Sequence, residues 1–228
     1  MDTLSKNNNE NISSSFRESA RLSGGDKRGA VSMKKDIIIS GVGGQGILSI
    51  SAIIGLAALE SGLNLKQSEV HGMSQRGGDV QANLRISSDT IYSDLISHKR
   101  ADLILSVEPM EALRYIPFLS PDGWIVTNIT PFKNIPDYPD DDALFAELKK
   151  HRNLVLVDAD KIAKECGTAR AGNIVMLGAA APFLDIQYDM LEFGIKKIFG
   201  RKGEEIVNIN LKAFKAGVEV SEKVIAEN

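Results

Sequence analysis

The sequence predicts an α/β fold: a Rossmann-like, largely parallel sheet flanked by helices, with a helical C-terminal part. From Lys34 onward, short apolar runs of strand length alternate with longer helical stretches, which is typical of sheets built by crossover connections. A glycine-rich turn joins the first run to the first helical stretch. Beyond Lys161 the pattern is mostly helical. A length of 228 residues suits one domain, which we place at residues 33–228.

The first half of the domain holds three predicted strands and one helix. Lys34–Ser40 contains three consecutive isoleucines and is interpreted as a buried strand. A helix with a mostly apolar surface follows over Gly46–Gly62, where a glycine can close its C-terminus. Asn64–Val70 is the second strand, and the glycine-bearing segment His71–Gly78 is a loop. Val80–Ser87 alternates apolar and polar residues, as a half-exposed strand does.

The second half continues the alternation. Ala101–Val107 is predicted to be a buried strand. A helix is predicted over Pro109–Leu119, with the proline as its first residue. Gly123–Ile129 and Asn153–Ala159 are further strands. Between them, the Pro- and Asp-rich segment Thr130–Asp142 is predicted to be a surface loop.

Residues 1–32 are predicted to be a disordered N-terminal tail. They are rich in Asn, Ser and charge, so they cannot bury enough apolar surface to offset the entropy of ordering. They also lack the apolar core of a secretory signal. The apolar run Ile174–Leu184 is too short to span a bilayer, which predicts no membrane association.

Charge and cysteine content exclude several classes of protein. A formal net charge of -3 argues against a general nucleic-acid binder, which needs a basic surface. The single cysteine, Cys166, excludes an internal disulfide and favours a reducing cytoplasm. It also excludes an iron–sulfur cluster held by this chain's cysteines alone, because such clusters take about four thiolates.

A glycine-rich loop follows the first strand and opens the first helix. Gly41, Gly43 and Gly46 satisfy the G-x-G-x-x-G spacing in the strand–turn–helix context that it requires. Glycines allow close backbone approach, and the N–H groups at a helix start bind anionic oxygens. A diphosphate is the expected ligand, although a tight turn without a ligand would show the same sequence pattern. The expected cofactor-binding residues are Gly41, Gly43, Gly44, Gln45 and Gly46.

An NAD(P)-binding oxidoreductase, or a nucleotide-binding regulatory domain, is therefore an alternative. A dinucleotide site needs an acidic residue at the end of the second strand, about 20 residues further on, to bind the ribose hydroxyls. Glu69 is a loose candidate for this role. It is followed at once by His71 and by a loop that a plain Rossmann domain does not need.

That second loop leaves the C-terminal end of a strand, where open α/β sheets bind ligands. Arg76 could grip a carboxylate or phosphate with two hydrogen bonds, and His71 could relay a proton near neutral pH. These two are the catalytic candidates. The alternatives are a structural hydrogen bond from His71 and an ion pair of Arg76 with Glu69 or Asp79. The expected substrate-loop residues are Gln75, Arg76, Gly77, Gly78 and Asn173.

Taken together, the two motifs resemble the gamma-type domain of pyruvate and other 2-oxoacid:ferredoxin oxidoreductases. They read GVGGQGI at 41–47 and SEVHGMSQRGG at 68–78. The HGMSQRGG form is similar to the indolepyruvate branch of the family, whereas relatives acting on pyruvate or 2-oxoglutarate usually carry a YGPExRGG-like version. The resemblance runs from Lys34 to the C-terminus and includes AGNIVMLG at 171–178 and the region 208–217.

This resemblance implies a reaction and a set of partners. Family members convert a 2-oxoacid, coenzyme A and oxidised ferredoxin to an acyl-CoA, carbon dioxide and reduced ferredoxin, using thiamine diphosphate with Mg and 4Fe-4S clusters. Neither the cysteines for clusters nor the Gly-Asp-Gly signature of thiamine enzymes is present here. The resemblance therefore implies a cytoplasmic, cofactor-free subunit without a metal site, inactive alone. Both cofactors would sit on a large alpha subunit, and ferredoxin would be reached through the complex.

Within that complex, the resemblance places His71, Gln75 and Arg76 nearest the substrate and coenzyme A at the glycine loop. Asn173 stands at a predicted helix start, where capping the helix is favoured over contacting a ligand. Met73 and Trp124 are interpreted as packing residues, and His98 and His151 receive no role.

Two further alternatives stay open. An activating enzyme for ubiquitin-like proteins also uses a G-x-G-G-x-G loop, but it often carries zinc-binding cysteines, and the lone Cys166 counts against it. A scaffold subunit whose glycine loop is only a turn is the other.

Overall fold

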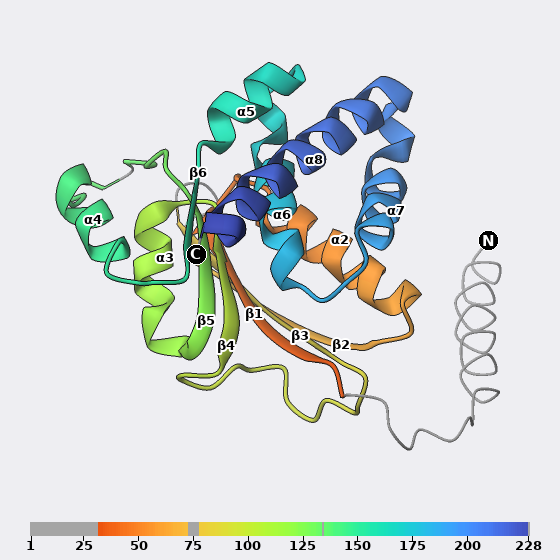
Figure 1. The fold of residues 1–228 in the computed structure, drawn as a ribbon, viewed down its shortest axis with the longest axis horizontal. Coiled ribbons are helices and arrows are strands. Elements are labelled where there is room, and N and C mark those ends of the chain that lie inside the picture. The colour runs from red at the N-terminus through yellow and green to blue at the C-terminus, as the bar shows by residue number, and fades with distance from the viewer. Residues whose placement is uncertain (1–31, 73–77, 134, 228) are drawn as a thin grey trace, which may run out of the picture. The chain divides into compact units, whose positions relative to one another are not determined.

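A mixed sheet forms the centre of the computed structural model, which describes residues 32–72, 78–133 and 135–227. In the described residues the sheet has six strands in the order β2-β3-β1-β4-β5-β6 (Figure 1). Their bounds are β1 Lys34–Val42, β2 Asn64–His71, β3 Asp79–Ser87, β4 Ala101–Ser106, β5 Leu119–Asn128 and β6 Leu154–Val157. The predicted tail, apart from Ser32, lies outside the described residues.

Strand direction agrees with the predicted, largely parallel sheet, with one exception. The pairs β1–β4, β4–β5 and β5–β6 are parallel, whereas β3 is antiparallel to both of its neighbours, β1 and β2. The connection between β2 and β3 is short, and parallel strands need a crossover of a dozen or more residues. The chain therefore returns as an antiparallel strand, which inserts between β2 and β1.

Helices lie against both faces of the sheet, and the predicted helical C-terminal part is confirmed. Their bounds are α2 Ile47–Glu60, α3 Pro109–Tyr115, α4 Asp141–Leu148, α5 Ala159–Cys166, α6 Gly172–Ala180, α7 Tyr188–Phe199 and α8 Glu204–Glu227. Short 3-10 turns lie at Ile116–Phe118, Ala169–Ala171, Ala181–Phe183 and Gly200–Lys202. None of the helices in the described ranges is both long and apolar enough to cross a membrane.

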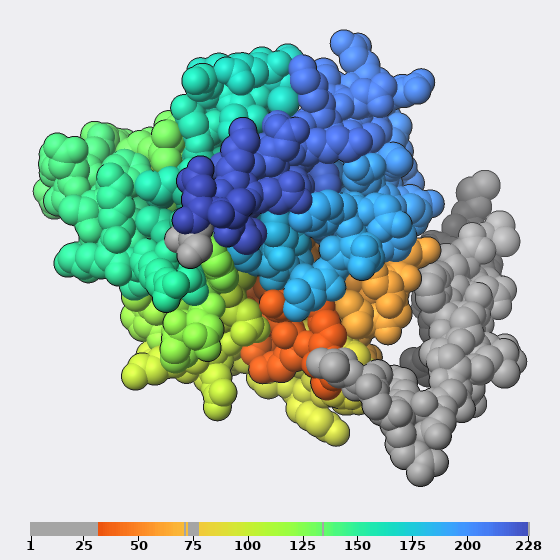
Figure 2. All heavy atoms as spheres, in the orientation of Figure 1, coloured from red at the N-terminus to blue at the C-terminus, as the bar shows by residue number. Residues whose placement is uncertain are grey.

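Two hydrophobic cores occupy the two faces of the sheet. Successive strand side chains point to opposite faces, so Ile37 and Ile39 of β1 enter the larger core while Ile38 enters the smaller one. The larger core packs against α2, α6, α7 and α8, and the smaller core packs against α3 and α4 (Figure 1). Figure 2 shows α8, in dark blue, at the surface beside α5 in teal and α7 in lighter blue.

Some boundaries differ from the predicted ones for local reasons. The helix predicted over Pro109–Leu119 ends as an α-helix at Tyr115, because a 3-10 turn containing Pro117 follows. Strand β5 consequently starts at Leu119 rather than at Gly123. Trp124 stacks on Phe183 with ring centroids 4.6 Å apart, which confirms its packing role.

Helices α6 and α8 approach each other backbone to backbone. A Cβ at Gly178 would lie 2.0 Å from the carbonyl oxygen of Phe214, and one at Gly217 would lie 2.1 Å from that of Val175. The buried hydroxyl of Ser221 donates a hydrogen bond to the carbonyl oxygen of Ala179 across the same contact, at 2.6 Å. These small residues let α8 fix the position of α6 against the sheet.

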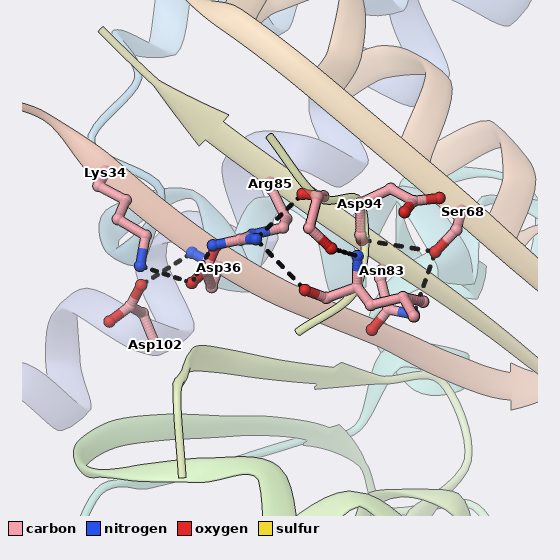
Figure 3. Close-up of polar contacts among 9 residues, drawn as sticks. Lys34, Asp36, Ser68, Asn83, Arg85, Asp94 and Asp102 are labelled. Carbon is pink, nitrogen blue, oxygen red and sulfur yellow. Dashed lines mark hydrogen bonds and ion pairs between the residues drawn. The ribbon is translucent and has the colours of Figure 1, made fainter. Parts of the chain in front are cut away.

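A polar network ties the segment Ser88–Arg100 to the face of the sheet that carries the smaller core (Figure 3). The buried carboxylate of Asp36 pairs with Arg85 through two contacts, of 2.7 and 3.2 Å. A third guanidinium nitrogen of Arg85 donates to the carbonyl oxygens of Ser93 and Leu95, at 3.0 and 3.3 Å. One arginine thus joins β1, β3 and the connecting segment.

Replacing Asp36 by alanine is expected to lower the free energy of unfolding by about 2–3 kcal/mol. Breaking a buried ion pair costs about 3–5 kcal/mol, and the side chain of Arg85 is 18% exposed, so solvent recovers part of this. Urea unfolding measures the loss. Lys34→Ala is the matched control, because its side chain is 52% exposed and surface pairs contribute about 0–1 kcal/mol. Equal losses in the two variants would contradict the structural role of the Asp36–Arg85 pair.

Candidate functional site

The glycine loop turns the chain from β1 into α2 and is braced by its own polar groups. The N–H of Gln45 donates to the carbonyl oxygen of Val42 at 3.1 Å, and the side-chain oxygen of Gln45 accepts from the N–H of Val42 at 2.7 Å. The N–H of Gly43 donates to the carbonyl oxygen of Gly78 at 2.8 Å. The last bond joins the glycine loop to the base of the second predicted loop.

Gly46 takes the position before the first residue of α2 in the left-handed region, with φ of 82°. Its carbonyl oxygen accepts a hydrogen bond from the side-chain amide of Asn173 at 3.3 Å. A Cβ at this position would lie 2.4 Å from the same amide nitrogen, so only glycine fits without displacing Asn173. No side chain caps the first turn of α2, so a ligand can satisfy N–H groups at the helix start that have no partner within the helix.

The expectation that Asn173 caps a helix is wrong. Ala171 occupies the N-cap position of α6, without a side-chain hydrogen bond, and Asn173 is the second helical residue. The side chain of Asn173 reaches instead to the glycine loop, 127 residues earlier in the sequence. Asn173 is therefore part of the loop's structure, and the packing of α6 on α8 holds it there.

A cavity of about 550 Å³ opens beside this loop, at the edge of the sheet where the parallel strands end. Its size lies within the range of about 300–1,000 Å³ found for small-molecule sites. Five separate segments of the chain build its wall. The lining residues are Gly44, Gln45, Gly46, Val107, Asn128, Thr130, Pro131, Phe132, Ala159, Asp160, Ala169, Arg170, Gly172 and Asn173.

The five predicted cofactor-binding residues divide into two groups. Gly44, Gln45 and Gly46 line the cavity, together with the predicted Asn173. Gly41 belongs to β1 and Gly43 binds Gly78, and neither is among the lining residues. The oxygen of Gln45 accepts from the Val42 N–H, and its amide NH₂ is the group that can donate to an anionic ligand.

Sequence reasoning missed four polar residues of the cavity: Asn128, Thr130, Asp160 and Arg170. Asn128 ends β5 and is buried, and its amide donates to the carboxylate of Asp160 at 3.1 Å. Arg170 is exposed in the turn before α6. The signal for Asn128 was available, since it follows a buried strand at the edge where α/β sheets bind ligands. Arg170 carried no signal of its own.

A buried carboxylate supports another wall of the cavity. Glu108 follows β4 and caps α3, accepting the N–H of Glu111 at 2.9 Å. Its other oxygen accepts the N–H of Phe132 at 3.2 Å and the hydroxyl of Tyr138 at 2.5 Å. Burial and the bond to Glu108 raise the pKa of Tyr138, so this hydroxyl stays protonated and donates. The predicted surface loop Thr130–Asp142 is thereby attached to the sheet, and its first residues line the cavity.

The second predicted loop lies largely beyond what the structure describes. His71 ends β2, paired with Val80, and Gly78 precedes β3, where its carbonyl oxygen binds Gly43. Gln75, Arg76 and Gly77, like Met73, lie outside the described residues. The catalytic and substrate-loop assignments to His71, Arg76 and their neighbours therefore stay predictions.

The acidic residue proposed for an NAD(P) site does not stand where such a site needs it. Glu69 belongs to β2, the edge strand, and β3 separates it from β1. A dinucleotide site takes its ribose ligand from the strand beside the glycine-loop strand. In this chain the strands beside β1 are the antiparallel β3 and the parallel β4, and Glu69 lies on neither, which weakens the dinucleotide alternative.

No three His, Cys, Asp or Glu side chains gather as possible metal ligands within the part of the chain that the structure describes. Cys166 is a buried free thiol at the end of α5.

Comparison with known proteins defines the class. The model of the family described as pyruvate ferredoxin/flavodoxin oxidoreductase matches residues 36–220. This chain therefore belongs to that family, and the resemblance drawn from the two glycine motifs is confirmed.

Its relatives include subunits of enzymes that act on 2-oxoacids. The chain is 35% identical over 200 residues to the indolepyruvate oxidoreductase subunit IorB of Pyrococcus horikoshii, covering 83% of this chain and 97% of that protein. It is 37% identical to the IorB subunit of Archaeoglobus fulgidus, covering 81% and 94%. Identity to the 2-oxoglutarate synthase subunit KorC of Archaeoglobus fulgidus is 27%, covering 83% and 89%.

Solved structures share the fold. A 2-oxoglutarate:ferredoxin oxidoreductase from Magnetococcus marinus aligns with a TM-score of 0.68 at 23% identity, covering 83% of this chain and 31% of that longer one. A pyruvate oxidoreductase subunit from Thermotoga maritima aligns with a TM-score of 0.63 at 23% identity, covering 82% and 96%. The predicted fold class is thus confirmed by two solved structures.

Proposed function

We propose that this chain is the cofactor-free, cytoplasmic subunit of an indolepyruvate-type 2-oxoacid:ferredoxin oxidoreductase. The complex makes an acyl-CoA, carbon dioxide and reduced ferredoxin, and a large alpha subunit holds thiamine diphosphate, Mg and the 4Fe-4S clusters. Support for the indolepyruvate preference comes from the HGMSQRGG loop and from the two relatives of 35% and 37% identity. Ferredoxin meets the complex rather than this chain.

The observation that carries the proposal is the cavity beside the glycine loop, which we assign to the diphosphate of coenzyme A. The glycine loop, which lies at the positive N-terminal end of α2, lines one side of it, and the cation of Arg170 lines another. Both attract anionic oxygens. The cluster cofactors do not fit this chain, because its one cysteine is buried and clusters take about four thiolates.

This proposal assigns different roles to the large subunit and to this chain. Thiamine diphosphate on the partner supplies the carbanion-stabilising chemistry of decarboxylation. This chain binds and orients coenzyme A: the glycine loop holds the diphosphate, and Asn173 fixes the loop by holding the carbonyl oxygen of Gly46. We further propose that the loop at His71–Gly78 faces the 2-oxoacid, with Arg76 on its carboxylate.

The experiment that tests the coenzyme A site is Gly44→Val in the assembled complex. A Cβ at Gly44 meets no atom within 4 Å, so the valine reaches only the space beside the loop. If the diphosphate lies there, we expect the KM for coenzyme A to rise at least about tenfold, equivalent to one lost hydrogen bond to a charged group. Steady-state kinetics with coenzyme A as the varied substrate measures the change.

Gly62→Val is the matched control for backbone strain. Gly62 has φ of 74°, close to the 99° of Gly44, and a Cβ there also meets nothing within 4 Å. It lies at the other end of α2, after the helix has ended. Both variants therefore carry the same kind of strain, and only Gly44→Val obstructs the cavity. An unchanged KM for coenzyme A in Gly44→Val would mean that the loop is only a turn.

A further inference from the structure

Phe132 combines two properties that packing alone does not explain. It is 47% exposed, although it is a large apolar residue, and it lines the cavity beside the glycine loop. The rest of that wall is largely polar or small. An aromatic ring left half uncovered in a ligand cavity offers a flat face on which a planar group can stack.

The backbone that carries this ring is held firmly. The N–H of Phe132 donates to Glu108, which is 0% exposed, at 3.2 Å. The same carboxylate oxygen accepts the hydroxyl of Tyr138 at 2.5 Å, six residues further along the loop. One buried oxygen thus joins both sides of the loop to the end of β4. Two hydrogen bonds to one buried oxygen restrain the backbone that carries the ring.

The position of the ring matters because of what shares the cavity. The anion-binding groups, Gly44–Gly46 and Arg170, line other parts of the same space. A ligand that satisfies all of them carries a phosphate part and a planar aromatic part. Coenzyme A has this composition, with an adenine base joined to a diphosphate.

We propose that Phe132 is a specificity-determining residue that stacks on the adenine base of coenzyme A, and that Glu108 is the positioning residue that holds it in the cavity wall. This inference rests on the proposed coenzyme A site. Stacking of a base on an aromatic side chain is sequence-tolerant, but it does require a base. Phe132, held by Glu108, therefore selects coenzyme A, which carries an adenosine, over phosphopantetheine, which does not.

The test compares two thiol substrates in the assembled complex: coenzyme A and 4′-phosphopantetheine, which has the thiol but lacks the adenosine and the diphosphate. Phe132→Ala is expected to raise the KM for coenzyme A about five- to a hundredfold, the measured range for loss of one stacked base. The KM for 4′-phosphopantetheine should stay unchanged. An equal rise for both substrates, or a rise for neither, would overturn the assignment.

Tyr138→Phe tests the positioning role without touching the cap of α3. It removes one of the two loop hydrogen bonds to Glu108, so the KM for coenzyme A alone should rise about two- to tenfold. A purely structural role would lower stability without separating the two substrates. If Tyr138→Phe leaves the KM for coenzyme A unchanged, Glu108 does not position the ring.

Ile135→Ala is the matched control. Ile135 is 44% exposed in the same loop but is not among the cavity-lining residues, so both KM values should stay at wild-type level. A rise in this variant equal to that of Phe132→Ala would mean that the loop contacts a partner subunit instead, and would refute the stacking role. Gly44→Val separates the two proposals: if it raises the KM for coenzyme A and Phe132→Ala does not, only the stacking inference is wrong.

Discussion

Replacing Gly217 by alanine is expected to destabilise the chain by about 3 kcal/mol or more. The added Cβ would lie 2.1 Å from the carbonyl oxygen of Val175 and 2.8 Å from the backbone nitrogen of Ala179. Overpacking in a core costs about 1–3 kcal/mol when side chains can adjust. Here the obstacles are backbone atoms of α6, so the two helices must separate. For a chain of this size the melting temperature should fall by about 6–12 °C or more.

Gly200→Ala is the control for glycine substitution in general. Gly200 has a right-handed helical φ of -54°, and a Cβ there meets nothing within 4 Å. Its melting temperature should be unchanged or slightly raised, because alanine restricts the unfolded chain. Thermal unfolding of the two variants side by side measures the difference. A loss at Gly217 no larger than the change at Gly200 would show that α6 and α8 are not in backbone contact.

Arg76→Ala is expected to lower turnover in the assembled complex about ten- to a hundredfold, while assembly survives. The reason is the loss of a charge-assisted hydrogen bond to the substrate carboxylate or to a coenzyme A phosphate, worth about 1.5–3 kcal/mol. Arg76→Lys should recover only part of the rate, because an ammonium group cannot reproduce the planar fork of arginine. Turnover is measured at a saturating concentration of this subunit.

The competing explanation is that Arg76 braces the loop by pairing with Glu69 or Asp79. It predicts weaker subunit affinity or lower stability, with normal turnover once the complex is saturated. Near-normal turnover of Arg76→Ala under saturating conditions would therefore remove Arg76 from the site. A titration of the large subunit with each variant separates affinity from rate.

Much of the fold followed from local patterns in the sequence. The isoleucine run of β1 and the glycine after α2 were correctly interpreted, because burial and helix termination leave local signatures. The place of β3 between β1 and β2 did not follow, since strand order depends on long-range pairing. The backbone contact of Gly178 with α8 could not be predicted either, because it joins two helices that lie apart in the sequence.

The candidate site could be predicted only in part, because only some of its residues leave a local signature in the sequence. Gly44 and Gly46 were found because a glycine loop between a strand and a helix has a recognisable spacing. Arg170 and Phe132 come from distant turns, and nothing in their neighbourhoods marks them as cavity residues. The prediction that Asn173 caps a helix was wrong, because its hydrogen-bond partner, Gly46, lies 127 residues away. A cavity assembled from five segments exists only once the sheet has brought them together.

Reconstitution with the candidate large subunit tests the central claim most directly. Ferredoxin reduction and acyl-CoA formation from indolepyruvate are measured with the large subunit alone, with this chain alone and with both. We expect this chain alone to be colourless and inactive, and we expect coenzyme A-dependent turnover only when both are present. Equal turnover by the large subunit without this chain would contradict the account, as would an iron–sulfur absorption band in this chain after anaerobic purification by itself.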